Sequence, residues 1–265
     1  MMNALVLNPQ NRRKVRKAPM NMAIKGFHLR GYPQTNDTWA SSVTFTLRVN
    51  GRARLDTLPC SPFVYPYFFD QPMYVAQNSE FELEYNASAA LIAAVDANPP
   101  VLVLEYEPIE QVKRSGNTMM KHFRFGPGLT YQDFTLYPKY YSRVLNSFCY
   151  EDDNALDPVI AVTGAAGQNT TNRFVLKYYL DSSRFVRLVD EGDWEWWRWG
   201  SFRRWVANHL QEVKRRRYWP GILIRPDMPF FMERVIPVGG LTAGTNIIYE
   251  FEFMDEVEFK KTMKR

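Results

Sequence analysis

The side chains that most often carry acid–base or metal chemistry are few in this chain and widely separated. Its three histidines are His28, His122 and His209, and its two cysteines are Cys60 and Cys149. This spacing offers neither a disulfide framework nor a set of metal ligands, and such residues are more often structural. We expect free thiols, no metal and no cofactor.

Two pairs of glutamates resemble the acid pairs of hydrolases. Glu105 and Glu107 alternate with aromatic residues, and so do Glu250 and Glu252. Positions i and i+2 of a strand put both carboxylates on one face, whereas a glycosidase pair flanks its substrate from different strands. The sequence also has no HExxH, GxSxG, P-loop or GxGxxG motif. We therefore expect no catalytic residues, and the chain is not predicted to be an enzyme.

A concentration of positive charge near the N-terminus is the clearest signal for binding. We call it the basic cluster, and its members are Arg12, Arg13, Lys14, Arg16 and Lys17. They account for the formal net charge of +5, so the rest of the chain is balanced. Phosphate, in nucleic acid or in lipid head groups, is the natural partner of such a cluster. The alternative is a solvated tail without a partner.

Residues 1–20, which contain the basic cluster, are predicted to form an extended arm. Asn8-Pro9 and Ala18-Pro19 oppose a stable helix, so we expect the arm to be mobile until it meets a partner. The apolar run at residues 4–7 is too short for the core of a signal peptide. On this interpretation, deleting residues 1–18 leaves the folded modules intact.

A second candidate interaction surface is the tryptophan cluster, formed by Trp194, Trp196, Trp197 and Trp199. A helix is predicted to follow it near residues 201–217, with an apolar stripe and a basic last turn. A basic helix beside tryptophans can bind nucleic acid or a membrane surface. The alternative, which the pattern favours, is a helix that covers a sandwich, with arginine stacked on tryptophan.

The elements that must position these residues are predicted to be β-strands. Aromatic residues make up 15% of the chain, and 17 prolines and 14 glycines interrupt it often, a pattern typical of short strands and many turns. No apolar run is long enough for a transmembrane helix. The proline-broken aromatic stretch at residues 63–69 is expected to plug one end of a sandwich; exposed, it would be an interaction surface.

Two patterns occur twice, in the same order. A strand–turn–strand unit surrounds Asn50-Gly51 at residues 43–56 and Asp181-Ser182-Ser183 at residues 173–188. A closing strand with alternating glutamates and aromatics lies at residues 101–107 and again at residues 247–253. We infer two related β modules in tandem, the alternative being chance pairs in an all-β chain. The predicted organisation is a basic arm (1–20), a first module (21–110), a linker (111–121) and a second module (122–265).

This organisation resembles the double jelly-roll major capsid proteins of viruses, and its size resembles the small, corticovirus-like type of membrane-containing bacterial viruses. The strand–turn units and the closing strands carry the resemblance; the tryptophan cluster matches nothing in that family. The resemblance implies an all-β fold of two tandem jelly-roll β-sandwiches with a helix inserted in the second. It also implies homotrimers that tile an icosahedral shell as pseudo-hexameric blocks, with the surplus aromatics in the interfaces.

The same resemblance implies the partners and the location. The partners are other copies of the chain, penton and minor capsid proteins, and inner-membrane lipid or genomic nucleic acid at the basic cluster. The chain is expected in the virion after synthesis in the host cytoplasm. Two alternatives remain: a minor phage structural protein of a vertex, collar or tail, and a two-jelly-roll protein that binds or hydrolyses glycans. The shape of the oligomer would distinguish the first alternative from a shell protein. The absence of a secretion signal argues against the second alternative.

Overall fold

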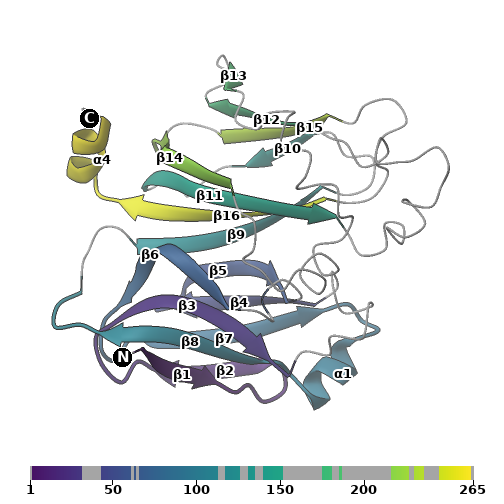
Figure 1. The fold of residues 1–265 in the computed structure, drawn as a ribbon. Coiled ribbons are helices and arrows are strands. Elements are labelled where there is room, and N and C mark those ends of the chain that lie inside the picture. Colours follow the sequence, from purple (N-terminus) through teal and green to yellow (C-terminus); the bar gives the residue numbers. More distant parts are fainter. Residues whose placement is uncertain are drawn as a thin grey trace. The chain divides into compact units, whose positions relative to one another are not determined.

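The computed structural model describes residues 2–31, 43–60, 63, 66–112, 117–125, 131–134, 140–151, 175–180, 185–186, 216–226, 230–235 and 245–263. These residues are mostly β-strands (Figure 1). They divide into two compact units: residues 1–122 with 248–254 form the first, and residues 123–247 with 255–265 form the second. Within the described ranges, no helix is long and apolar enough to cross a membrane.

One sheet of the first unit has four antiparallel strands in the order β1-β8-β3-β6. Their bounds are β1 Asn3–Leu7, β8 Val101–Pro108, β3 Met22–Arg30 and β6 Tyr67–Val75. The inner strand β3 is buried over most of its length, as expected for a strand with neighbours on both sides. β1 and β6 are the two edges of this sheet.

A second sheet contributes six strands to the first unit, in the order β2-β7-β4-β5-β9-β16. Its strands are β2 Arg13–Lys17, β7 Glu80–Ala87, β4 Val43–Val49, β5 Arg52–Pro59, β9 Asn117–Phe125 and β16 Thr245–Met254. β7 shows the alternation that period two requires: Phe81, Leu83 and Tyr85 are buried, and the glutamates between them are not. The short helix α1 (Ile92–Ala97) contacts β7.

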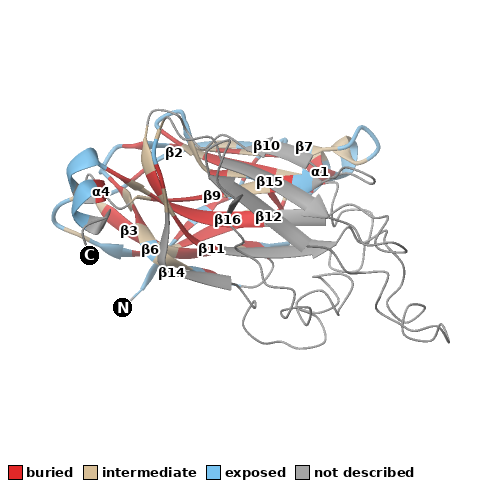
Figure 2. Cartoon of the chain, turned by 90° about the horizontal axis from the view of Figure 1, so that it is seen from above, coloured by how far each residue is buried: buried red, intermediate tan, exposed pale blue. Residues whose placement is uncertain are grey.

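The core of the first unit is rich in aromatic rings. Phe27 lies 4.8 Å from Phe63 and 5.8 Å from Tyr67 between ring centroids, and all three are buried. The prediction that the stretch 63–69 plugs a sandwich is confirmed for Phe63 and Tyr67, whereas Phe68 is exposed. Figure 2 shows buried residues in red along the inner strands. The aromatics at these buried positions therefore stabilise the core and do not supply an interface.

Asn50-Gly51 forms the hairpin turn that the sequence predicts. β4 and β5 pair antiparallel on either side of it, and both turn residues have positive φ, 51° for Asn50 and 75° for Gly51. Two central residues with positive φ define the turn whose twist matches that of a hairpin. The Asn50 side chain also accepts a hydrogen bond from the backbone N–H of Glu80 at 2.8 Å, which ties the turn to β7.

The second unit contains a four-stranded sheet in the order β10-β15-β12-β13. These strands are β10 Tyr131–Phe134, β15 Phe230–Val235, β12 Val175–Leu180 and β13 Phe185–Val186. β12 and β13 pair antiparallel, so the second predicted strand–turn–strand unit is also a pair of neighbouring strands. β11 (Tyr141–Glu151) pairs with β14 (Arg216–Ile224). The predicted fold class, an all-β sandwich, is confirmed.

The structure corrects the predicted helix at its C-terminal end. Residues 201–215 lie outside the described residues, but Arg216–Ile224 is the strand β14, in which Arg216 and Arg217 pair with Ser147 and Asn146 of β11. The basic run therefore does not end a helix at 217. Ladder hydrogen bonds to a neighbouring strand outweigh the helical periodicity of the local sequence.

The predicted linker is also corrected. Residues 117–121 belong to β9, and Met119 and Met120 are fully buried in it. β9 pairs in parallel with β5 through Leu55–Met120 and Asp56–Lys121. A linker with buried apolar side chains and sheet pairing is part of the fold, so the first unit extends to residue 122, and it also includes residues 248–254.

The predicted mobile arm is wrong. Residues 3–7 are the strand β1, which pairs with β8, and residues 13–17 are the strand β2, which pairs with β7. Leu5 and Leu7 are buried, and Ala18 is tied to Ser79 and Asn78 by backbone hydrogen bonds. The prolines, Pro9 and Pro19, oppose a helix as expected, but both lie outside β1 and β2 and so do not interrupt the strand pairing.

Candidate functional site

A tight turn between β1 and β2 holds Arg12, and β2 carries the other four members of the basic cluster. Gln10 and Arg13 exchange two backbone hydrogen bonds of 3.0 and 3.1 Å, and Asn11 and Arg12 between them have φ of 48° and 67°. Asparagine tolerates this left-handed region better than other side chains. Arg12 is held there because the backbone N–H of Tyr85 donates to its carbonyl oxygen at 2.9 Å.

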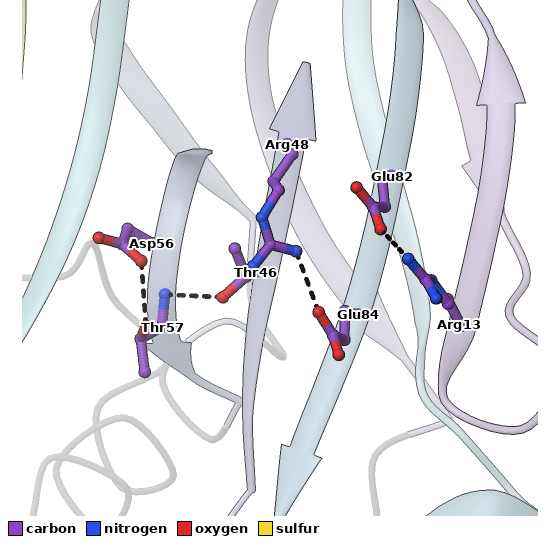
Figure 3. A network of polar contacts seen from close by, with 7 residues as sticks. All are labelled: Arg13, Thr46, Arg48, Asp56, Thr57, Glu82 and Glu84. Atoms are coloured by element: carbon purple, nitrogen blue, oxygen red, sulfur yellow. Dashed lines mark hydrogen bonds and ion pairs between the residues drawn. The ribbon is translucent and has the colours of Figure 1, made fainter. Parts of the chain in front are cut away.

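Two members of the basic cluster are paired with carboxylates. Arg12 Nε lies 2.5 Å from Asp96 Oδ1 of α1, and Arg13 forms an ion pair with Glu82 of β7 (Figure 3). The hydrogen bond with Glu82 raises the pKa of Arg13, so its charge is fixed. Surface ion pairs of this kind add little stability. They do, however, neutralise two of the five positive charges that could otherwise bind a partner.

The other three members differ from these two. Lys14 and Arg16 lie opposite Leu83 and Phe81 of β7, so they point to the inner side of the sheet at its open edge. Arg16 Nη1 donates to the carbonyl oxygen of Val6 in β1 at 2.9 Å and so joins the edges of the two sheets. Within the described part of the chain, Lys14 and Lys17 have no carboxylate partner. The structure therefore leaves three cations available, not five.

Charges on the outer face of the larger sheet are balanced by a ladder of ion pairs. Beside the Arg13–Glu82 pair, Arg48 Nη1 lies 3.0 Å from Glu84 Oε2, as Figure 3 shows. Further along, Lys121 Nζ lies 3.2 Å from Asp56 Oδ2. Acidic side chains of β7 thus meet basic ones on both sides. These pairs leave Lys14, Arg16 and Lys17 of β2 outside the ladder.

The glutamate pairs have structural partners. Glu250 is fully buried and accepts hydrogen bonds of 2.7 Å from the hydroxyl of Tyr67 and from the backbone N–H of Asp70. Glu105 Oε1 lies 3.4 Å from His28 Nδ1, and Glu107 Oε2 lies 3.0 Å from Lys25 Nζ. The sequence placed the glutamates on one face, but it did not indicate that Glu250 joins β16 to β6.

The remaining candidates for chemistry do not form a site among the described residues. Cys60 is a free, buried thiol, and burial raises its pKa well above the ordinary value. His122 Nδ1 lies 3.1 Å from the carbonyl oxygen of Thr57. In the described ranges no group of three or more His, Cys, Asp or Glu side chains could hold a metal ion. The tryptophan cluster, residues 194–199, lies outside the described residues.

The apolar residues around the basic cluster are candidates that no motif in the sequence indicated. Met2, Val6, Val15 and Met20 are exposed at or beside β1 and β2. Once the segment is recognised as strand, period-two alternation would have found Val6, since Leu5 and Leu7 on either side face the core.

The fold and the site together define an all-β protein of the jelly-roll sandwich class, with a cationic strand edge as its candidate interaction site. The structure is similar to the crystal structure of the major capsid protein P2 from bacteriophage PM2, with a TM-score of 0.50 and 12% sequence identity. The similarity covers 97% of this chain and 98% of that chain. No protein-family profile and no curated protein sequence matches the chain. At this identity the similarity establishes the fold.

Proposed function

We propose that this chain is a viral structural protein, a major capsid protein whose copies tile an icosahedral shell. The observation that supports the proposal is the extent of the structural similarity, which covers 97% of this chain and 98% of a phage major capsid protein. A shared domain would match only part of one chain. Here the correspondence runs through both units, which is what a whole capsid subunit of the same architecture would give.

The proposed assembly unit is a homotrimer. Each chain has two compact units, so three chains around an axis present six units, and a pseudo-hexagonal block of this kind can tile a closed shell. Its permanent interfaces should be large. The proposed partners are further copies of the chain, penton proteins and minor capsid proteins, and the proposed location is the virion, after synthesis in the host cytoplasm. The corticovirus-like type is proposed on the same similarity.

In such a shell, the three available cations of the basic cluster would face inward, toward phosphate. Each phosphate neutralised contributes about −0.9 to the slope of log affinity against log salt for duplex DNA. With Arg12 and Arg13 already paired, we expect a slope of about −2.7, in contrast to about −4.5 for five free cations.

Native mass spectrometry and sedimentation of the purified protein test this function. The expected species has three times the 31.1 kDa mass of the chain, and it should associate into closed shells visible by electron microscopy. Five-fold rings would assign the chain to a vertex instead. A protein that stays monomeric at high concentration and is absent from particles would overturn the proposal.

A further inference from the structure

Exposed apolar side chains gather where the basic cluster lies. Among the described residues, six large hydrophobic side chains are exposed, and four of them fall in the first 20 residues. Their exposed fractions are 51% for Met2, 43% for Val6, 50% for Val15 and 37% for Met20. Scattered exposed apolar residues need no explanation, but a group on one edge indicates an interaction surface.

This edge is cationic because the local sequence contains no acid. The first carboxylate of the chain is Asp37, so only distant segments can neutralise the basic cluster. Asp96 and Glu82 neutralise Arg12 and Arg13, while Lys14, Arg16 and Lys17 keep their charge available. The result is a narrow surface that combines cations with flexible or branched aliphatic groups. We call it the N-terminal edge: β1, β2, Met2 and Met20.

The composition of the N-terminal edge favours lipid over nucleic acid. Proteins that bind single-stranded nucleic acid stack bases on aromatic rings, and the first aromatic residue of this chain is Phe27. Exposed valine and methionine gain nothing from phosphates, but they gain free energy when they enter the boundary between head groups and acyl chains. Anionic head groups supply the complementary charge.

A second copy of the chain is a poorer occupant for this edge. Pairing by strand addition needs free backbone groups, and Arg16 already occupies the outward carbonyl of Val6. Lysine and arginine on an edge strand also oppose pairing between like edges. These charges do not oppose an anionic bilayer.

We propose that the N-terminal edge is a docking surface for an anionic lipid bilayer. Lys14, Arg16 and Lys17 contact head-group phosphates, and Met2, Val6, Val15 and Met20 enter the interfacial zone. The inference deepens the proposed function by naming lipid as the partner of the cluster, but its evidence is the surface itself.

The test is co-sedimentation of the full-length protein with vesicles of phosphatidylcholine containing about a quarter phosphatidylglycerol, at about 50 and about 300 mM salt. The charge variant is Lys14→Gln with Lys17→Gln. Each basic residue near an anionic surface contributes about fivefold, so we expect roughly thirtyfold weaker binding. The matched control is Lys25→Gln with Lys260→Gln, which removes the same charge from residues paired with Glu107 and Glu256. It should bind within about twofold of the natural chain.

The apolar variant, Val6→Thr with Val15→Thr, preserves shape and strand propensity. It should weaken vesicle binding about fivefold at both salt concentrations, since insertion of apolar groups is not screened. The same variant should leave binding to an oligothymidylate, measured by fluorescence anisotropy, unchanged. Circular dichroism melts establish that each variant is folded.

Four results would overturn the proposal: equal binding to pure phosphatidylcholine, unchanged vesicle binding by the charge variant, binding to the oligonucleotide but not to vesicles, or pelleting without vesicles. The last would identify the edge as a contact between copies. Trimer formation is measured on the same samples. A trimer that does not bind vesicles refutes the lipid surface alone, and a monomer that binds them refutes the trimer alone.

Discussion

Tyr67 and Tyr85 are both buried in the first unit, but their hydroxyl groups have different surroundings. The Tyr67 hydroxyl donates to the buried carboxylate of Glu250. The Tyr85 hydroxyl has no hydrogen-bond partner among the described residues, and burial raises its pKa well above the ordinary value. A buried polar group without a partner costs stability, whereas one with a hydrogen-bond partner contributes to it.

Tyr85→Phe should therefore keep or raise the free energy of unfolding, by up to about 1 kcal/mol, as measured by urea denaturation. Tyr67→Phe is the matched variant, and it should lower the same quantity by about 2 kcal/mol because Glu250 loses a donor. Equal losses in the two variants would mean that the Tyr85 hydroxyl has a partner in solution.

His28 gives the stability of the first unit a dependence on pH. Burial lowers its pKa below the ordinary 6.5, and the nearby Arg30 lowers it further, while Glu105 acts in the opposite direction. Arg30 Nε donates to His28 Nε2 at 3.1 Å, so that nitrogen carries no proton in the fold. Because the unfolded chain binds the proton more readily, the contribution of His28 is complete above pH 6.5 and is lost as pH falls through the folded pKa.

We expect His28→Gln to show a smaller loss of stability than the natural chain between pH 6.5 and about pH 5, where most carboxylates do not yet titrate. Urea denaturation at several pH values measures the difference. His122→Gln serves as a control, since the contact of His122 with a backbone carbonyl does not involve His28. Identical pH profiles for the natural chain and His28→Gln would contradict the assignment.

At the scale of elements, two glycines are required for different reasons. Gly26 follows a register shift in β3, and a Cβ there would overlap the carbonyl oxygen of Tyr67 and lie 2.8 Å from Phe68 Cδ1. Gly51 has open space around it, but its φ of 75° disfavours side chains. A side chain is excluded at Gly26 by the close approach of β6, and it is disfavoured at Gly51 by the backbone conformation.

Gly26→Ala should lower the free energy of unfolding by about 2–3 kcal/mol because β6 must shift. Gly51→Ala should cost about 1 kcal/mol, and Gly51→Asn less, because asparagine tolerates the left-handed region. Thermal and urea unfolding of the three variants measure these values. A mild Gly26→Ala variant would show that β6 moves away easily.

The strands β1 and β2 make the N-terminus part of the folded unit. Deleting residues 1–18 removes the buried Leu5 and Leu7 and exposes the edges of β8 and β7. We expect a loss of about 3–6 kcal/mol, since each fully buried leucine contributes about 1.5–3 kcal/mol, together with aggregation through the new edges. Deletion of Met2 alone, which is exposed, is the control. If the truncated chain is as stable and as soluble as the full chain, the two strands contribute nothing.

At the scale of the whole molecule, the first unit is discontinuous in sequence. Residues 248–254 belong to it, and Ile248, Tyr249, Glu250 and Phe251 are buried there. The contact between Tyr67 and Glu250 joins positions 183 residues apart. The first unit is therefore complete only when residues 248–254 have been made.

A fragment of residues 1–125 should not unfold cooperatively in urea, because one strand of its sheet is missing. The same fragment joined by a flexible linker to residues 245–255 should recover a cooperative transition. A fusion that carries Glu250→Leu and Phe251→Ser in the added strand should fail to do so, since it loses the bonds to Tyr67 and buries a hydroxyl. A cooperative transition in the fragment alone would contradict the discontinuous unit.

The sequence by itself determined the features that depend on local chemistry. Alternation of polar and apolar residues specified strands, and Asn50-Gly51 specified a hairpin because these residues adopt positive φ at low cost. It also located the basic cluster. These properties are set within a few residues by the backbone and by side-chain periodicity.

Only the tertiary structure decided which of these residues are free. Arg13 forms its ion pair with Glu82 because β2 pairs with β7, and Arg12 meets Asp96 because α1 lies near the turn. No local pattern indicates which strands become neighbours, so the sequence showed five cations where the fold leaves three. For the same reason the burial of Glu250 and the exposure of Val15 depend on residues far along the chain, which are brought together by sheet order.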